Sequence, residues 1–378
     1  MKIFLLFVFW ALWFLAFSTR TLFSPLLPVI EDELAISHTL AGSLFTFLSF
    51  GYTITLFISG LLCLRIGYKR TIVVGFAILI LSFFLLNYAT NYFSLILILF
   101  FIGLGAGVYV PSVTPLITET FSRRHWGKVI AFHESAAAFS VLCIPLLVSI
   151  SLRFFQWRTL FVILSGVCLV VVLIFSAITP EPRVQEQTKA RLSHIILRRD
   201  FWVMTILWTF ASMASNGVYS VTPLFLVKEK GMDMALANEI FGYSRIGVLF
   251  VTVLMGFLLD RYGVKKILLF VIVTTGLSTA GVAIADNDTL LVTMLFFQAT
   301  LSGAFFPVGI VTMSVLTTTQ ERSIFAGGAL AIGTMFGLGI TPLALGAVAD
   351  IWSFRVGILV VGILVTLCSF SLKGLRQI

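Results

Sequence analysis

Two arginines, Arg20 and Arg245, lie within stretches of sequence that are otherwise apolar enough to cross a lipid bilayer. An arginine at membrane depth costs about 2.5–3.5 kcal/mol on insertion scales and persists mainly where it faces an internal cavity or a partner. A guanidinium grips a carboxylate through two parallel N–H donors. Because few acidic residues accompany these two cations, the sequence favours a cavity shaped for an anion.

The two arginines differ in expected depth. Arg245 precedes Asp260 by 15 residues, which is about 22 Å of helix within an apolar core about 30 Å thick. Small and hydroxylated neighbours, such as Ser244 and Gly247, suit a cavity wall. The alternative is an ion pair with Glu239 or Glu134 that only ties helices together. Arg20 has another alternative, because its side chain can snorkel to the outer surface about ten residues away.

His133 and Glu134 form the second chemical candidate. Glu134 is the only carboxylate expected clearly inside an apolar helix of the first half. A desolvated carboxylate beside an imidazole can take up and release a proton near neutral pH. This pair is therefore the expected carrier of a coupling proton. The alternative is that Glu134 only pairs with basic residues at the inner face, namely Arg123, Arg124 or Lys128.

Membrane helices must position these residues. The chain of 378 residues is 59% hydrophobic and 11% charged, with a mean hydropathy of +1.10, which lies outside the range of soluble domains. No small-residue cleavage site precedes Arg20, so we expect the first apolar stretch to be a retained helix. The pattern of apolar stretches predicts about twelve spans, near 4–30, 38–64, 71–89, 93–118, 128–150, 158–178, 201–226, 236–259, 266–285, 289–315, 323–348 and 355–372.

The basic residues predict the orientation. With the N-terminus inside, eighteen of the 25 Lys and Arg residues fall in cytoplasmic segments and five in outer segments, and the other two are Arg20 and Arg245. This asymmetry is a strong positive-inside signal. It predicts a cell-membrane protein with both termini in the cytoplasm. The net charge of +9 is therefore no indication of nucleic-acid binding.

An internal duplication organises the chain. The stretch from Gly60 to Arg70 matches the stretch from Gly256 to Lys266 at an offset of 196 residues, and the same offset takes Pro111 to Pro307 without a gap. One register across separate helices predicts two six-helix bundles as parallel repeats. The expected boundaries are 1–178 and 201–378, joined by a polar cytoplasmic linker at 179–200 that is partly helical along the membrane surface.

The repeated element resembles the signature loop of the major facilitator superfamily, in the form Gly-x-Leu-x-x-Asp-Arg-x-Gly-x-Lys-Lys. Its first copy has Leu64 where the second has Asp260, so we expect weaker or differently made gate contacts in the first half. We expect Gly60 and Gly256 to admit close neighbouring helices and the later glycines to permit a tight turn. The motif residues are Gly60, Arg65, Gly67, Gly256, Asp260, Arg261 and Gly263.

The resemblance implies an all-α membrane fold that works by alternating access, with a path lined by the first, fourth, seventh and tenth helices. The stretch from Arg20 to Pro28 is also similar to the first helix of organic-anion symporters, in which the arginine binds the substrate. The offset takes Arg20 to Asn216 in the seventh helix. Tyr109 in the fourth helix and Gln298 in the tenth complete the expected cargo contacts.

The sequence thus predicts a monomeric secondary transporter that moves a small organic anion of the carboxylate type together with protons. The alternative is a drug, lipophile or sugar exporter of the same fold. Drug exporters of the family carry a glycine-rich motif in the fifth helix, whereas this chain has Cys143-Ile144-Pro145-Leu146-Leu147 there. No catalytic dyad, phosphate loop or metal-like cysteine spacing is evident, so neither an enzyme activity nor a cofactor is expected.

Overall fold

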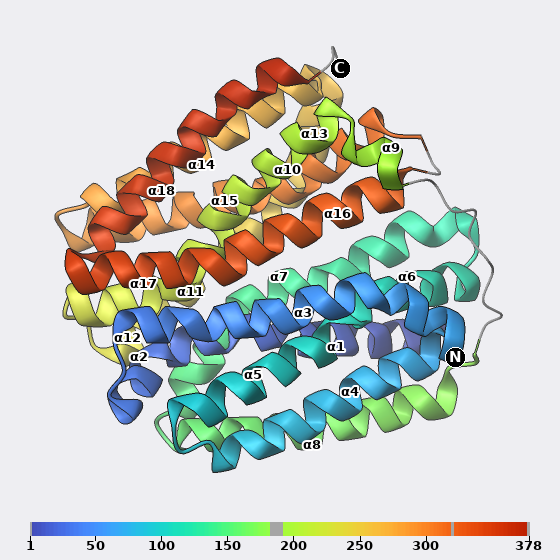
Figure 1. Ribbon diagram of the computed structural model, residues 1–378, viewed down its shortest axis with the longest axis horizontal. Coiled ribbons are helices and arrows are strands. Elements are labelled where there is room, and N and C mark those ends of the chain that lie inside the picture. Colours follow the sequence, from blue (N-terminus) through green and yellow to red (C-terminus); the bar gives the residue numbers. More distant parts are fainter. Residues whose placement is uncertain (1, 182–191, 319–320, 376–378) are drawn as a thin grey trace. The chain divides into compact units, whose positions relative to one another are not determined.

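The structure is a computed structural model that describes residues 2–181, 192–318 and 321–375, and within these ranges every regular element is a helix (Figure 1). The chain folds into two compact units. The first comprises Met1–Ile36 and Leu44–Glu186, and the second comprises Ser37–Ser43 and Gln187–Ile378. The expected linker at 179–200 includes residues 182–191, which lie outside the described residues.

Eight α-helices and two short 3-10 turns begin in the described part of the first half. Their bounds are α1 Lys2–Thr21, α2 Phe23–Leu34, α3 His38–Ile66, α4 Tyr68–Leu85, η1 Leu86–Tyr88, α5 Tyr92–Gly107, α6 Tyr109–Thr120, η2 Arg123–His125, α7 Trp126–Ser151 and α8 Trp157–Ile178.

The second half adds ten α-helices, three π-helical segments (η3, η4 and η5) and a 3-10 segment (η6) in its described part. Their bounds are α9 Leu192–Ile196, α10 Arg199–Ser212, η3 Met213–Gly217, α11 Val218–Leu224, η4 Phe225–Glu229, α12 Met234–Tyr243, α13 Ile246–Tyr262, α14 Val264–Ile284, α15 Asp288–Leu316, α16 Arg322–Thr334, η5 Met335–Ile340, α17 Thr341–Ile351, α18 Phe354–Cys368 and η6 Ser369–Gly374.

Eleven helices in the described part of the chain are long and apolar enough to cross a membrane, and they coincide with eleven of the expected spans. The expected span at 201–226 is not among them. Residues Arg199–Glu229 nevertheless form consecutive helical segments. Their apolar character is interrupted by Ser212, Ser215 and Asn216. The prediction of a multi-pass helical membrane protein is confirmed, while the count of twelve spans stays a prediction.

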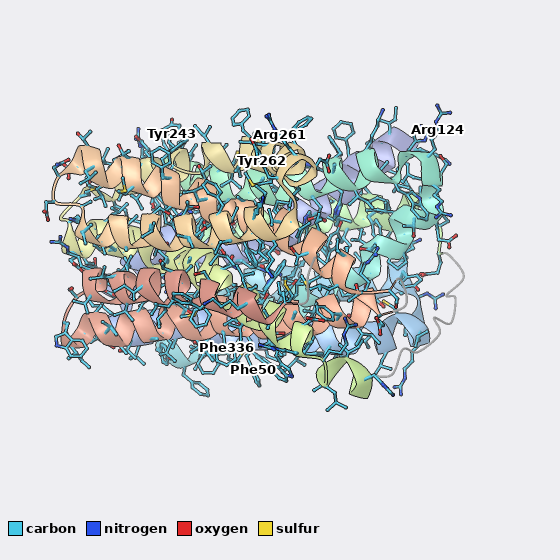
Figure 2. The ribbon with its side chains drawn as sticks, turned by 90° about the horizontal axis from the view of Figure 1, so that it is seen from above. Phe50, Arg124, Tyr243, Arg261, Tyr262 and Phe336 are labelled. Atoms are coloured by element: carbon cyan, nitrogen blue, oxygen red, sulfur yellow. The ribbon has the colours of Figure 1, made fainter. Side chains whose placement is uncertain are left out.

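The surface of the helices is apolar, as a lipid-facing surface must be. Phe50, Tyr243 and Phe336 project outward (Figure 2), with exposed fractions of 48%, 56% and 45%. In water such residues would form large apolar patches that soluble proteins avoid. In a bilayer they face lipid tails, while the helices satisfy their own backbone hydrogen bonds.

The duplication is visible in which helices pack together. In the first unit α4 packs against α5 and α8, and in the second unit α14 packs against α15 and α18. The 196-residue offset relates these helices pairwise, and it also relates the packed pair α1 and α7 to the pair α10 and α16. Each unit thus repeats the same choice of neighbours.

Two helix breaks coincide with prolines. Proline has no backbone N–H to bond the carbonyl four residues before it. Pro25 therefore leaves the carbonyl of Thr21 without its helical partner, and α1 ends at Thr21. Pro111 does the same for Gly107, where α5 ends. These breaks place Arg20 and Tyr109 beside irregular backbone within their helices.

Candidate functional site

Arg245 lies at a helix break that no proline causes. α12 ends at Tyr243 and α13 begins at Ile246, so Arg245 is the N-cap residue of α13, with φ −90° and ψ −4°. Its N–H donates to the carbonyl of Gly242 at 3.0 Å, and its own carbonyl accepts from the N–H of Val248 at 3.0 Å. The side chain of Arg245 is only 3% exposed.

Two aromatic rings hold the Arg245 guanidinium. Its Cζ atom lies 4.9 Å from the ring centroid of Tyr219 and 4.9 Å from that of Phe241. The two rings are themselves 4.6 Å apart, and both are buried. A cation is attracted to the negative face of an aromatic ring, more strongly where water is excluded. The rings therefore fix the position of the cation without neutralising it.

One edge of this guanidinium has no hydrogen-bond acceptor among the described residues. Within the described residues, neither Nε nor Nη2 of Arg245 has a hydrogen-bond partner, although both atoms are buried. The N–H bonds of these two nitrogens point the same way, along the edge that grips a carboxylate in bidentate fashion. Leaving such charged donors unsatisfied is costly. The arrangement is thus suited to receive an anion.

Gly247 brings α15 close to this site. A methyl group at Gly247 would lie 3.0 Å from Cβ and Cγ2 of Thr300 and closer still to its hydroxyl oxygen. Only glycine therefore allows α13 and α15 to pack at this distance, two residues after Arg245. Gly247 thus has a packing role, and the expectation that the small neighbours of Arg245 border a cavity stays a prediction.

Gln298 and Asn216 lie around the π-helical segment η3 in the same unit. The Nε2 atom of Gln298 donates to the carbonyl of Ala214 at 2.8 Å, and its Oε1 atom is buried without a partner in the described part of the chain. Asn216 donates through Nδ2 to the hydroxyl of Ser212 at 2.8 Å. Among the described residues no hydrogen bond joins either amide to Arg245. Gln298 therefore stabilises the irregular segment η3.

Arg20 has a comparable but more open setting in the first unit. Its Cζ atom lies 3.7 Å from the ring centroid of Tyr52 and 5.4 Å from that of Phe17. Its Nε atom is buried and has no hydrogen-bond partner within the described residues. Arg20 as a whole is half-buried. Like Arg245, it is a cation held by rings.

One glycine in α3 and one in α5 let these two helices pack closely beside Tyr52 of α3. A methyl group at Gly103 would lie 2.8 Å from the backbone nitrogen of Tyr52, and one at Gly51 would lie 3.0 Å from the backbone nitrogen of Leu104. Small residues at such points let membrane helices approach closely. The glycine-rich fourth span thus positions the ring that covers Arg20.

Tyr109, His133 and Glu134 form a connected network in the first unit. The hydroxyl of Tyr109 donates to the carbonyl of Phe9 at 2.7 Å and lies 3.1 Å from Nε2 of His133. The Nδ1 atom of His133 is 3.1 Å from Oε1 of Glu134. Tyr109 and His133 are buried, whereas the Glu134 side chain is 55% exposed. The expected imidazole–carboxylate pair is present, and Tyr109 joins it.

The two signature loops confirm one expectation and overturn another. Gly67 and Gly263 have φ of +90° and +81°, a region that glycine adopts readily. Gly60 and Gly256 are exposed, and a methyl group at either would meet nothing within 4 Å. The prediction that these two glycines admit close neighbours is therefore wrong for this structure.

The charged motif residues Arg65, Asp260 and Arg261 are exposed at helix ends. Figure 2 shows Arg261 at the surface beside Tyr262, with Cζ 5.3 Å from the tyrosine ring centroid. Within the described residues, no group of three or more His, Cys, Asp or Glu residues could hold a metal ion.

Sequence reasoning missed Tyr52 and Phe241. Phe241 precedes Arg245 by four residues, a spacing that places two side chains on one helix face, so this contact could have been expected. Tyr52 has no such signal, because it comes from another helix and the 196-residue offset takes it to Val248.

Comparison with known proteins gives the family. Residues 9–251 and 239–375 match the sequence model of the Major Facilitator Superfamily. An uncharacterized MFS-type transporter of Bacillus subtilis is 30% identical over 47% of this chain and 46% of that protein. The hexuronate transporter of the same organism is 26% identical over 81% of this chain and 72% of that protein. The cis,cis-muconate transport protein of Acinetobacter baylyi is 23% identical over 90% and 86%.

A solved structure has the same fold. The inward-facing, unoccupied structure of a bacterial homologue of the human lysosomal transporter Spinster matches with a TM-score of 0.84. The match covers 99% of this chain and 96% of that chain, at 15% sequence identity.

Proposed function

This chain belongs to the Major Facilitator Superfamily and is a membrane transporter, and we propose that its cargo is a small organic anion of the carboxylate type. The observation that carries the proposal is the buried Nε–Nη2 edge of Arg245, which has no acceptor among the residues that the structure describes. A buried guanidinium without an acceptor is costly in a membrane protein. A carboxylate cargo would supply both acceptors at once.

The aromatic setting of Arg245 favours a bound anion over a purely structural ion pair. A structural pair would leave the cation satisfied by a protein carboxylate. Here the rings of Tyr219 and Phe241 hold the guanidinium by its faces, which leaves its edge free for hydrogen bonds. Arg20, held over Tyr52, is the second proposed cargo-binding cation, and Asn216 and Gln298 are proposed to supply nearby amide groups.

Two relatives support the anionic class. Hexuronates and muconate, after which the Bacillus and Acinetobacter proteins are named, are organic anions with carboxylate groups. A buried arginine can bind such a carboxylate through two parallel donors, and this chain has a buried arginine in Arg245. The proposed class of anionic cargo rests on Arg245 and agrees with the compounds in these two names.

We also propose that transport proceeds by alternating access of two bundles, 1–178 and 201–378, and that protons drive it. The proposed proton carriers are His133 and Glu134, which are linked at 3.1 Å. The signature-loop residues Arg65, Asp260 and Arg261 are proposed gate residues at the cytoplasmic side, and the transporter is proposed to work as a monomer with both termini in the cytoplasm.

A thermal-shift screen tests the cargo class. The purified protein is heated with mono- and dicarboxylates, sugar acids, neutral sugars and lipophilic cations, at about pH 5.5 and 7.5. A bound ligand raises the melting temperature by mass action. Stabilisation by carboxylates supports the proposal. Stabilisation by lipophilic cations or neutral sugars alone would contradict it and favour an exporter of those compounds.

A further inference from the structure

Three planar side chains from three helices meet in the first unit. Trp13 of α1, Tyr109 of α6 and His133 of α7 have ring centroids 5.5 to 5.9 Å apart and interplanar angles of 7° to 17°. All three residues are no more than 5% exposed. This close packing fixes the orientation of the His133 ring, so its two nitrogens face defined partners.

The direction of the hydrogen bonds can be derived from the partners. A tyrosine hydroxyl has one hydrogen, and a backbone carbonyl can only accept. Tyr109 therefore donates its hydrogen to the Phe9 carbonyl, 2.7 Å away. The Tyr109 oxygen must then accept from Nε2 of His133, 3.1 Å away. His133 accordingly carries a hydrogen on Nε2.

The hydrogen-bonding role of Nδ1, the other ring nitrogen of His133, follows from the same comparison of donors and acceptors. Neutral His133 with a hydrogen on Nε2 presents a lone pair at Nδ1. Oε1 of Glu134 lies 3.1 Å from that nitrogen, and an ionised carboxylate also presents only lone pairs. The contact is attractive only if one proton lies between them, either on Nδ1 or on the carboxyl group.

We propose that His133 and Glu134 form a site for one exchangeable proton and that Tyr109 positions this proton by holding the hydrogen of the imidazole on Nε2. Only the link between this proton and transport rests on the function proposed above. It also assigns Tyr109 to the proton site rather than to the cargo, because its hydroxyl is buried between Phe9 and His133.

The neighbouring elements add no competing charge to this network. Within the described residues, the titratable groups found in contact with His133 are Tyr109 from α6 and Glu134 from α7. α1 contributes Trp13 and the Phe9 carbonyl, neither of which titrates in the physiological range. The exchangeable proton therefore belongs to the His133–Glu134 pair.

The exposure of Glu134 indicates where the proton enters and leaves. The Tyr109 side of the ring is closed by buried groups, whereas the Glu134 side chain is 55% exposed. When the bridging proton departs to solvent, two sets of lone pairs face each other and repel. The Glu134 carboxylate is then expected to turn away from His133, which retains its hydrogen on Nε2.

Nitrogen NMR on protein labelled with 15N-histidine tests the proposal, since the chain has only four histidines. His133→Asn identifies the His133 signals. In the wild type, Nε2 should stay protonated across the titration and only Nδ1 should change. Tyr109→Phe removes the acceptor and should give a mixture of both neutral forms, whereas Tyr88→Phe, at an exposed tyrosine of the same unit, should leave the spectrum unchanged.

Glu134→Gln provides a second, shape-conserving variant. The glutamine amide can donate to Nδ1, so neutral His133 with hydrogen on Nε2 should predominate over a wider pH range than in the wild type. A wild-type spectrum in which neutral His133 carries its hydrogen on Nδ1 would overturn the proposal. An unchanged spectrum in Tyr109→Phe would overturn the role of Tyr109. If the spectra are as expected but the wild type shows no proton-driven uptake, the proposed coupling is refuted and the proton site stands.

Discussion

The Oε1 atom of Glu181 accepts a hydrogen bond from the backbone N–H of Lys69 at 3.0 Å, at the first turn of α4. Oε2 of the same carboxylate accepts from the N–H of Arg70 at 3.2 Å. A carboxylate satisfies the free N–H groups at a helix N-terminus and interacts favourably with the helix dipole. The signature loop that lacks an acid at Leu64 thus has a carboxylate from the segment after α8.

Removal of this carboxylate should destabilise the protein. Glu181→Ala is expected to cost about 1 kcal/mol, as loss of a helix cap does, and to lower the melting temperature in detergent. Glu181→Gln keeps one acceptor oxygen and should lose less. Equal melting temperatures for the wild type and the alanine variant would show that the cap does not form in solution.

Gly247 offers a test of the packing beside Arg245. Gly247→Ala should destabilise the protein by about 1–3 kcal/mol through overpacking against Thr300. Thr300→Ala removes the hydroxyl and the methyl group that the new side chain would meet, so the double variant should recover part of the loss. Melting temperatures of all four proteins give the coupling between the two positions. Additive effects would contradict this packing.

Glu134→Gln tests proton coupling directly. The variant keeps the shape and a hydrogen-bonding group but cannot release a proton. In proteoliposomes it should lose uphill accumulation driven by a proton gradient, while exchange of cargo across the membrane persists because exchange needs no net proton movement. If the variant still concentrates cargo like the wild type, Glu134 is not the proton carrier. The carrier would then be Glu239 of α12 or Glu119 of α6, or an ion other than the proton would drive transport.

Cysteine labelling tests the predicted orientation. A membrane-impermeant reagent applied from outside should label a cysteine at Asp288, in the expected outer turn at 286–288. It should not label one at Leu197, in the segment 183–199 that is expected in the cytoplasm. Both positions are exposed, Leu197 at 84%, and the chain without new cysteines gives the background. The reverse pattern would overturn the orientation.

Much of the fold could be predicted because it depends on local composition. The spans follow from runs of apolar residues, and the turns at Gly67 and Gly263 follow from a motif in which glycine provides the positive φ. These spans and turns need no knowledge of distant contacts. The breaks at Thr21 and Gly107 coincide with Pro25 and Pro111, which each remove a helical hydrogen bond. Pro307, the repeat counterpart of Pro111, lies inside the unbroken α15, so proline alone does not predict a break.

Features that depend on packing could not be predicted in the same way. The break at Arg245 has no proline, and the ring of Tyr52 reaches Arg20 from another helix. Gly60 resembles an interface glycine in sequence, yet only the folded chain shows that it is exposed. The pairing of Tyr109 with His133 likewise depends on how α6 packs against α7.

Binding of a carboxylate by Arg245→Lys tests the central claim most directly. Isothermal titration of the best carboxylate from the thermal-shift screen would compare the wild type, Arg245→Lys, Arg20→Ala and a surface control, Arg153→Lys. Lysine keeps the charge but cannot present two parallel donors, so affinity should fall about tenfold or more, while the control binds normally. Wild-type affinity in both Arg245→Lys and Arg20→Ala would contradict the anion site.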